Sequence, residues 1–575
     1  MGQDNTGPGR RAFLKYAGIT GGGLLLAGCT GNQDEEGNGN GNGNGNGNGN
    51  GNGNSNGNGN GNGNGGSDPP GTEYRYVTTI TPSTIDPHKV SDELEAMFAH
   101  NVYDPLLYYT NETPPELVPW LAEDWEVSDD NETYTFQLRE DATFHNGDDV
   151  TAEDIAYSVT RLVRMQRGFS YMFAGVLTED SATVVDDYTV ELNLERPFAP
   201  IMSTLPFLFI TNKQQIEDNI QDGGEFGEKG DYGGEWLENN TAGSGAYQLE
   251  TRNRKTAIRM TKNEDWWGEF ADGNSFEQAV FEMVPEPSTV TGKMREGEGD
   301  LSDQWLPLQS YNELDQEDNI TVSVETTFTP MYVFMHNQKA PFDDINVRKA
   351  MAYAFDYDQL LTGIMNGDSV QMQGPLPEAM WGHNDDLKVY NKDLDQAQEF
   401  LEMSDYSGDE LNFTYTYVTG LSIRENIGLL LQSDLQELGI DVEVSADPWS
   451  KITSDHANID QSPDMIATVL SFNYADPDNF LYPAWHSSSH GSWQSGSWYE
   501  NERVDELLDE ARATVGREAR IPLYEEAQRL INEDMPALFT MNQAQRWAVN
   551  DRLNGFNDNG VTGYLNRPAW FTAEE

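Results

Sequence analysis

Cysteine, basic residues and long apolar segments are scarce in this sequence of 575 residues. A single cysteine excludes an intrachain disulfide framework and any cysteine-rich metal site. Only 34 lysines and arginines stand against 97 aspartates and glutamates, which excludes a nucleic-acid binder, because phosphate contacts need clustered basic residues. The same imbalance disfavours electrostatic docking on anionic lipid. Beyond the N-terminal region, no stretch approaches the roughly 18 consecutive apolar residues of a membrane-spanning helix.

Motifs of catalysis are missing as well. The sequence has no Gly-x-Ser-x-Gly elbow, no His-Glu-x-x-His and no phosphate-binding loop ending in Gly-Lys-Ser/Thr. Carboxylates are so numerous that pairs of them say nothing about acid–base chemistry. The closest histidine pair is His486 and His490, which could be metal ligands or exposed loop residues; we favour the loop. We therefore expect no enzymatic activity, no metal and no cofactor.

Aromatic residues are abundant, with 13 Trp, 25 Tyr and 24 Phe. A disordered acidic chain would be poor in such residues, so most of this sequence is expected to fold. Its length suggests two to four domains.

The N-terminus has the features of an export signal. Arg10 and Arg11 precede a short, weakly apolar run that ends in Leu-Ala-Gly-Cys at Cys29. The run is too short to span a bilayer, and it resembles a twin-arginine signal with a lipobox. We therefore expect residues 1–28 to be a lipoprotein signal, with lipid attached to Cys29 at the outer face of the cell membrane. Residues 29–71 should be a flexible tether, because residues 37–66 consist of Gly and Asn with one Ser.

The formal net charge of −63 has two interpretations. It could match a cationic ligand, or it could keep the surface hydrated in molar salt. Acidic residues are spread along the whole chain and do not gather in one tail or patch. We therefore favour a halophilic host.

Helical and strand-like patterns alternate along the body of the chain. Alternating polarity predicts strands at 133–138 and 188–194. A helix is expected from residue 152 after Thr151, a plausible N-cap with Asp154 three residues later. Helical spacing also marks 347–355 and 427–438, the second ending at Gly439 before a strand at 440–444. Residues 504–531 should form one or two helices, with Pro522 marking a start or a break. This order predicts an α/β fold.

Eight sequence blocks, in order, resemble the family 5 extracytoplasmic solute-binding proteins, the peptide- and nickel-binding components of ATP-driven importers. They cover nearly all of the chain from Thr72 to Phe571. The blocks are residues 85–88 (Ile-Asp-Pro-His), 102–107, 117–125, 134–154, 263–267 (Asn-Glu-Asp-Trp-Trp), 337–350, 475–480 (Ala-Asp-Pro-Asp-Asn-Phe) and 504–508.

The resemblance implies two α/β lobes of a periplasmic binding protein, joined by two crossovers, with the ligand in the cleft between them. The larger lobe would comprise residues 72–327 plus 540–575, and the second lobe residues 328–539. The protein would be a monomer that captures a dipeptide or oligopeptide, closes by a hinge motion and delivers its ligand to the permease subunits of an ABC transporter.

The resemblance also implies candidate ligand-binding residues. In peptide-binding relatives a strand after the Asp-Pro-His block lends main-chain groups to the peptide; here it maps onto Val90, Ser91, Asp92 and Glu93. A cleft tryptophan matches Trp449. The family's Asp that pairs with the peptide ammonium is replaced by the neutral Asn473, which weakens the expected bond. Further candidates are Ser471, Asp476, Tyr332 and Phe334.

Two departures from the family pattern leave the ligand open. Besides Asn473, no arginine stands where dipeptide binders hold the C-terminal carboxylate, and the nearest basic residue is Arg424. The same scaffold could instead bind an oligosaccharide or a nickel complex. A third hypothesis is a surface hydrolase that uses a pair of carboxylates, since glycosidases need only two carboxylates at a suitable separation.

Overall fold

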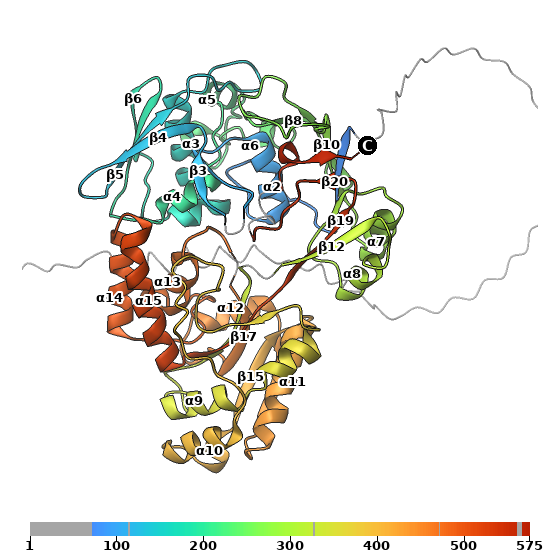
Figure 1. Cartoon of the computed structure of the whole chain (residues 1–575). Coiled ribbons are helices and arrows are strands. Elements are labelled where there is room, and N and C mark those ends of the chain that lie inside the picture. The colour runs from blue at the N-terminus through green and yellow to red at the C-terminus, as the bar shows by residue number, and fades with distance from the viewer. Residues whose placement is uncertain (1–71, 113–114, 326–327, 471, 561–565, 575) are drawn as a thin grey trace, which may run out of the picture.

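The structure is a computed structural model, and it describes residues 72–112, 115–325, 328–470, 472–560 and 566–574 (Figure 1). The expected signal, tether and lipid-bearing Cys29 lie outside the described residues, and so does Ser471.

A seven-stranded mixed sheet forms the centre of one half of the molecule. Its strands, in spatial order, are β12 (Ile320–Glu325), β19 (Gln545–Asn550), β11 (Leu301–Ser302), β1 (Glu73–Thr78), β10 (Gln278–Met283), β9 (Ala257–Lys262) and β8 (Tyr247–Asn253). Strand β1 pairs in parallel with both β10 and β11. Strand β19 comes from near the end of the chain, yet it lies between two strands from the first part of the body.

A six-stranded mixed sheet forms the centre of the other half. Its strands, in spatial order, are β14 (Val370–Gln371), β18 (Ala537–Asn542), β13 (Pro330–Met335), β17 (Met465–Val469), β15 (Phe413–Val418) and β16 (Val442–Asp447). Strand β15 runs parallel to both β16 and β17. Helix–strand alternation around these parallel strands is the α/β pattern expected from the sequence.

A separate four-stranded antiparallel sheet belongs to the first half. It comprises β4 (Ala122–Val127), β5 (Thr133–Leu138), β7 (Thr189–Asn193) and β6 (Ala182–Asp186). Two small ribbons pair β2 (Leu107–Tyr109) with β3 (Leu117–Pro119), and β20 (Leu553–Asn554) with β21 (Thr572–Ala573).

Helices cover the sheets in both halves. Those of the first half are α2 (Glu93–Val102), α3 (Ala152–Met165), α4 (Ile201–Thr204), α5 (Lys213–Glu217), α6 (Gly234–Leu237), α7 (Pro287–Arg295) and α8 (Leu308–Leu314). Those of the second half are α9 (Ile345–Ala354), the π-helical η4 (Gln359–Ile364), α10 (Leu394–Met403), α11 (Ser422–Gln436), α12 (Trp449–His456), α13 (Asp478–Trp485), α14 (Glu502–Ala513) and α15 (Arg517–Asp534).

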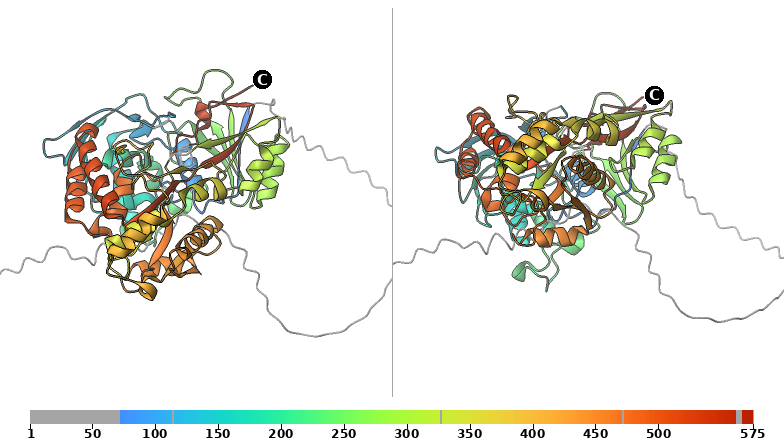
Figure 2. Two further views of the ribbon diagram at one scale, coloured as in Figure 1. Left: turned by 60° about the horizontal axis from the view of Figure 1, so that its bottom comes forward. Right: turned by 90° about the horizontal axis from the view of Figure 1, so that it is seen from below.

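The two halves lie one above the other in Figure 1, with helices α9, α10 and α11 in the lower half, the end that Figure 2 turns towards the viewer. The chain passes between the two large sheets twice, between β12 and β13 and between β18 and β19. We propose that these halves are the two expected lobes. Residues 540–542, which the sequence assigns to the larger lobe, pair with the six-stranded sheet as the end of β18.

Several predicted elements are confirmed. Strand β5 covers residues 133–138, and Thr151 and Asp154 form a capping box at the start of α3. Helix α11 is followed by Gly439, whose φ of +75° suits the glycine-favoured C-terminal turn. The interpretation of Pro522 is wrong, because this residue lies inside α15. The break between α14 and α15 instead falls at Gly516, with a φ of +94°.

The C-terminal segment is anchored in the first half by Arg567. Its guanidinium is completely buried among the rings of Tyr108, Trp120, Trp266 and Trp570, at 4.6 to 5.6 Å from their centroids. The carboxylate of Asp104 lies 3.6 Å away. Cation–π attraction and this carboxylate stabilise a charge that would otherwise be costly to bury.

Candidate functional site

Three parallel strands of the six-stranded sheet end at the same edge. The register pairs Val418 of β15 with Asp447 of β16, and Thr416 of β15 with Ile466 of β17. In open α/β sheets, ligands bind outside the carboxyl ends of such strands. The described segments that follow the three strands are the start of α11, the start of α12 and residues 472–477. This edge is the first part of the candidate site.

Trp449 lies at this edge as the first residue of α12. Its side chain is half-buried and packs edge-on against Trp493, with ring centroids 5.3 Å apart. A half-buried aromatic pair beyond the carboxyl ends of parallel strands provides an apolar surface for a ligand. Its role as a ligand contact stays a prediction.

Asn473 follows β17 at the same edge. Its side chain is half-buried, and its backbone N–H donates to Oδ1 of Asn479 at 3.1 Å. This hydrogen bond ties the segment after β17 to helix α13. A contact between Asn473 and a ligand also stays a prediction.

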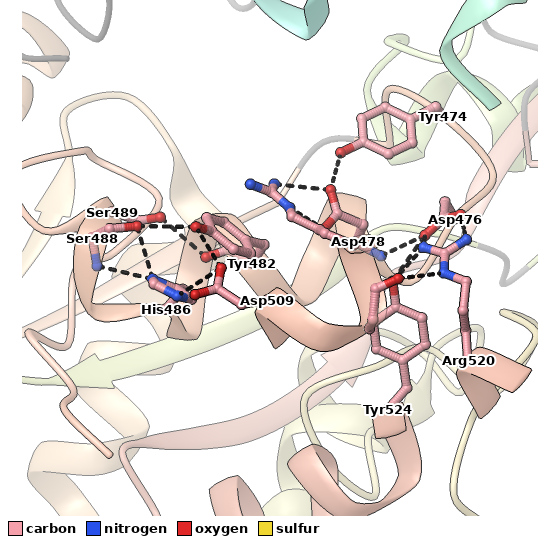
Figure 3. A network of polar contacts seen from close by, with 12 residues as sticks. Tyr474, Asp476, Asp478, Tyr482, His486, Ser488, Ser489, Asp509, Arg520 and Tyr524 are labelled. Carbon is pink, nitrogen blue, oxygen red and sulfur yellow. Dashed lines mark hydrogen bonds and ion pairs between the residues drawn. The ribbon is translucent and has the colours of Figure 1, made fainter. Parts of the chain in front are cut away.

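Asp476 and Asp478 are both engaged in buried ion pairs (Figure 3). Asp476 accepts two hydrogen bonds from Arg520 of α15, and Asp478 accepts two from Arg512 of α14. Burial opposes the charge of Arg512, but Asp478 more than compensates and raises the pKa of the guanidinium. The two pairs fasten α14 and α15 to α13. In this structure Asp476 has no oxygen left over for a ligand unless Arg520 moves.

Tyr332 and Phe334 lie in the core of the second half. Both are completely buried on β13, and both rings contact Trp485. The hydroxyl of Tyr332 donates to the carbonyl of Pro375 at 2.7 Å. Neither side chain can reach a ligand in this conformation, because the alternation along β13 turns both into the same packed layer.

The first half offers a second edge of the same kind. Strands β1, β10 and β11 are parallel, and Asp303 directly after β11 accepts hydrogen bonds from Thr78 and Thr79 at the end of β1. Glu93 of α2 accepts hydrogen bonds from Gln304 and Trp305, each at 2.8 Å. The N-terminus of α2 therefore lies at this edge.

The expected strand at Val90 to Glu93 does not form. Ser91 and Asp92 precede α2, and the carboxylate of Asp92 caps the helix by accepting from the N–H of Glu95 at 2.9 Å. An Asp at this position is a strong N-cap, which explains why the chain turns into a helix here. Ser91 is exposed, and its N–H donates to the carboxylate of Glu95 at 2.9 Å, while Asp92 and Glu93 are half-buried.

The carboxyls at the start of α2 have unusual protonation equilibria. Burial and the neighbouring charge of Glu95 raise the pKa of Asp92 to about 8. Burial also raises the pKa of Glu93 to about 7, although the hydrogen bonds from Gln304 and Trp305 oppose this. A cationic group placed beside these carboxyls would favour their ionised forms.

Direct contacts join the two halves. The hydroxyl of Tyr109 accepts from the N–H of Ala475 at 3.0 Å, two residues after Asn473. The N–H of Ala199 donates to the carbonyl of Arg512 at 2.7 Å. The edge that carries Asn473 therefore faces the first half of the molecule.

The block at residues 85–88 has a structural role in this fold. Asp86 accepts two hydrogen bonds from Arg161 of α3, each at 2.7 Å, and both side chains are fully buried. Burial and the charge of Arg161 lower the pKa of His88 to about 3. His88 instead bonds the carbonyl of Phe209 at 2.9 Å, so the block fixes the loop that leads to Ser91.

The histidine pair does not converge. His486 stacks on Tyr482 and bonds Ser488 (Figure 3). His490 instead bonds the carbonyl of Tyr499. Among the described residues, no group of three or more His, Cys, Asp and Glu side chains is arranged to hold a metal ion. In the same part of the chain, no helix has the length and apolar character needed to cross a bilayer.

Sequence reasoning missed several residues at the two edges. Trp305 is 40% exposed beside Glu93, and Trp493 partners Trp449. Tyr109 makes one of the contacts between the halves. Trp305 follows a strand of only two residues, which has no detectable alternation, and the other two contacts join residues far apart in the sequence.

Comparison with known proteins adds a family match. A family model described as "Bacterial extracellular solute-binding proteins, family 5 Middle" matches residues 116–492. The chain is 28% identical over 487 residues to the "Probable D,D-dipeptide-binding periplasmic protein DdpA" of Escherichia coli, spanning 83% of this chain and 89% of that protein. It is 24% identical over 463 residues to "Heme-binding protein A" of Haemophilus influenzae, spanning 77% and 82%.

Solved structures share the fold. The periplasmic binding protein DppA from Helicobacter pylori, in complex with the peptide STSA, matches with a TM-score of 0.69 at 25% identity, covering 88% of this chain and 98% of that one. HbpA2 from Haemophilus parasuis matches with a TM-score of 0.75 at 21% identity, covering 88% and 100%. These likenesses confirm the expected α/β fold of periplasmic binding proteins.

Proposed function

Because this chain belongs to the family 5 extracellular solute-binding proteins, we propose that it captures a peptide or peptide-like solute outside the cell and delivers it to the permease of an ABC importer. The observation that carries this proposal is that each half has parallel strands ending at an edge of the kind where ligands bind in α/β folds. One bears the start of α2 with Trp305, and the other bears Trp449 and Asn473. The names of several relatives, which specify dipeptides, support a peptide as the ligand.

The ligand would lie between these edges and favour a closed state. Contacts such as the one between Tyr109 and Ala475 form only when the halves are together. A ligand that touches both halves adds to such contacts and shifts the equilibrium towards closure. In this arrangement Trp449 and Trp305 provide apolar walls, and main-chain groups near Ser91 and Asn473 provide hydrogen bonds. Tyr332 and Phe334, which belong to β13, would hold this strand in place by packing in the core.

A thermal-shift screen in high salt tests the ligand class. Ligand bound to the folded state alone raises the melting temperature by linkage. We expect stabilisation by dipeptides or longer peptides. The panel includes oligosaccharides, nickel and haem, because the scaffold supports alternative ligands. Stabilisation by one of these and by no peptide would contradict the proposal. Product formation on prolonged incubation would overturn the non-enzymatic role.

We further propose that the protein is exported and held at the outer face of the membrane by lipid on Cys29, as a monomer in a halophilic host. The support is the order of signal, lone cysteine and Gly/Asn tether in the sequence. Replacing Cys29 by Ser should release the protein into the medium with its ligand affinity unchanged. Continued membrane association of Cys29→Ser would contradict a lipid anchor.

A further inference from the structure

The sequence contains five Asn-x-Thr sequons, which begin at Asn111, Asn131, Asn239, Asn319 and Asn412. In an exported protein this motif is the acceptor of N-linked glycosylation. The twin-arginine signal expected at the N-terminus is typical of proteins that are exported already folded. A glycosyl transferase at the outer face of the membrane would therefore meet the folded chain. Accessibility in the folded state then decides which sequon reacts.

Two of the sequons run into paired strands. Asn319 directly precedes β12, and the hydroxyl of Thr321 donates to the carboxylate of Asp551 at 3.0 Å. Asn412 directly precedes β15, an interior strand of the six-stranded sheet, and its Oδ1 accepts from the N–H of Asp441 at 2.8 Å. A transferase has to draw both the amide and the hydroxyl of a sequon into its active site. Neither of these sequons can be drawn out without breaking hydrogen bonds of the fold.

Two further sequons have an engaged amide nitrogen. Nδ2 of Asn131 donates to the carbonyl of Ala513 at 3.2 Å, which is a contact between the two halves. Nδ2 of Asn111 donates to the carbonyl of Gly555 at 3.1 Å. Both asparagines are half-buried. A saccharide on either nitrogen would displace these hydrogen bonds, and on Asn131 it would stand between the halves.

Asn239 differs from the other four asparagines. It is exposed and lies in the loop between α6 and β8, in the upper half of the molecule in Figure 1. Its backbone N–H donates to the carbonyl of Trp236 at 3.2 Å, but its side chain has no hydrogen bond among the described residues. The neighbouring Asn240 is also exposed, yet its Nδ2 donates to the same carbonyl at 2.9 Å. The amide that belongs to the sequon is therefore the accessible one.

We propose that Asn239 carries an N-linked saccharide and that the other four sequons stay unmodified. This inference rests on the proposed export of the chain, because the saccharide donor is met at the outer face of the membrane. Nδ2 of Asn239 attacks the anomeric carbon of a lipid-phosphate-linked saccharide. A C–N bond forms as the C–O bond to the phosphate breaks, the lipid phosphate leaves, and the amide proton passes to a base of the transferase. The product adds a bulky hydrophilic group without displacing a hydrogen bond of the described fold.

Mass spectrometry of the protein purified from the membrane of its own host tests the proposal. Trypsin cuts after Lys229 and Arg252, and the peptide between these cuts has Asn239 as its sole sequon. We expect this peptide to carry the mass of a saccharide and the peptides of the other four sequons to have unmodified masses. An unmodified 230–252 peptide, or a saccharide on any of the other four asparagines, overturns the proposal.

Matched variants assign the added mass to one nitrogen. Asn239→Gln and Thr241→Ala should each remove it, because each destroys the sequon. Asn240→Gln changes the exposed neighbour but keeps the sequon, and Asn319→Gln removes a sequon that is held in the sheet. Both of these controls should keep the full added mass. A mass that survives in Asn239→Gln is not attached at this site and refutes the assignment.

Protease treatment of intact cells separates the failure of this inference from the failure of the proposed export. Protein that is digested from outside and yet lacks a saccharide on Asn239 refutes the modification and leaves export standing. Protein that is protected and unmodified refutes both. Replacing Arg10 and Arg11 by Lys should keep the chain inside the cell with Asn239 unmodified. A saccharide on this retained chain would contradict modification at the outer face.

Discussion

Asp476 and Arg520 form two hydrogen bonds of 2.6 and 2.7 Å, with both side chains buried at the base of α13. The hydroxyl of Tyr524 completes the cluster by contacting both partners (Figure 3). A buried ion pair adds little stability over an apolar pair, but loss of one partner leaves an uncompensated charge. This pair therefore makes the position of α15 relative to α13 specific.

Replacing Arg520 by Met should lower the free energy of unfolding by about 3–5 kcal/mol, because Asp476 is left buried without its partner. The double variant Asp476→Asn with Arg520→Met should lose less free energy of unfolding than the single variant Arg520→Met. Chemical denaturation at fixed salt measures both. The exposed Arg517→Met is the control and should change stability by no more than about 0.5 kcal/mol. Equal losses for Arg517→Met and Arg520→Met would contradict the structural role of the pair.

Replacing Tyr109 by Phe should weaken ligand binding about 3- to 10-fold. The substitution leaves the N–H of Ala475 without its acceptor only when the halves are together, and such a hydrogen bond contributes about 1 kcal/mol. Calorimetric titration gives the affinity. Tyr157→Phe is the matched control, because its buried hydroxyl has no hydrogen-bond partner among the described residues. If Tyr109→Phe binds the ligand as tightly as Tyr157→Phe does, the hydrogen bond of Tyr109 does not contribute to closure.

Replacing Asp92 by Asn should make the protein more resistant to alkaline pH. The folded-state pKa of Asp92 is raised to about 8, so the folded state holds a proton that the unfolded state releases near pH 4. Stability from this group is therefore complete below about pH 4 and is lost as the pH rises through about 8. Asn keeps the helix cap but removes the titration.

Melting temperatures from pH 5 to 9 check this expectation. The melting temperature of Asp92→Asn should rise relative to that of the unaltered protein as the pH increases. The two melting temperatures should differ least at pH 5. Asp130→Asn is the control, since its exposed carboxyl has a lowered pKa through hydrogen bonds from Ser128 and Glu132. Parallel pH profiles for Asp92→Asn and the unaltered protein would show that Asp92 is ionised in the folded state.

Replacing Trp449 by Ala should reduce ligand affinity about tenfold or more while changing the melting temperature little. A large aromatic contact in a binding site commonly contributes more than about 1.4 kcal/mol. Trp236→Ala provides the comparison, because this half-buried tryptophan lies in α6 of the first half. If both variants bind with unaltered affinity, Trp449 packs against Trp493 for structural reasons alone.

Local patterns predicted much of the fold. The alternation at residues 133–138 and the capping box at Thr151 are properties of a few neighbouring residues, and both are confirmed. The roles of Asp476 and Asp86 could not be predicted in this way. Their partners Arg520 and Arg161 lie 44 and 75 residues away, so the pairing exists only after the chain has folded.

The places of two candidate residues in the fold could be anticipated from the sequence, whereas their contact with a ligand stays a prediction. Trp449 and Asn473 follow neighbouring parallel strands, and strand order can be anticipated from family resemblance. Whether a side chain turns to the core or to the edge depends on the sheet, as Tyr332 and Phe334 show.

The position of β19 between β12 and β11 restricts when the protein can fold. A ribosome delivers residues 545–550 only after more than nine-tenths of the chain has been made. Until then the first sheet has an open gap, and the rings of Tyr108, Trp120 and Trp266 have no Arg567 to surround. The first half therefore completes its fold after translation of the second half, so a nascent chain needs protection from premature aggregation throughout its synthesis.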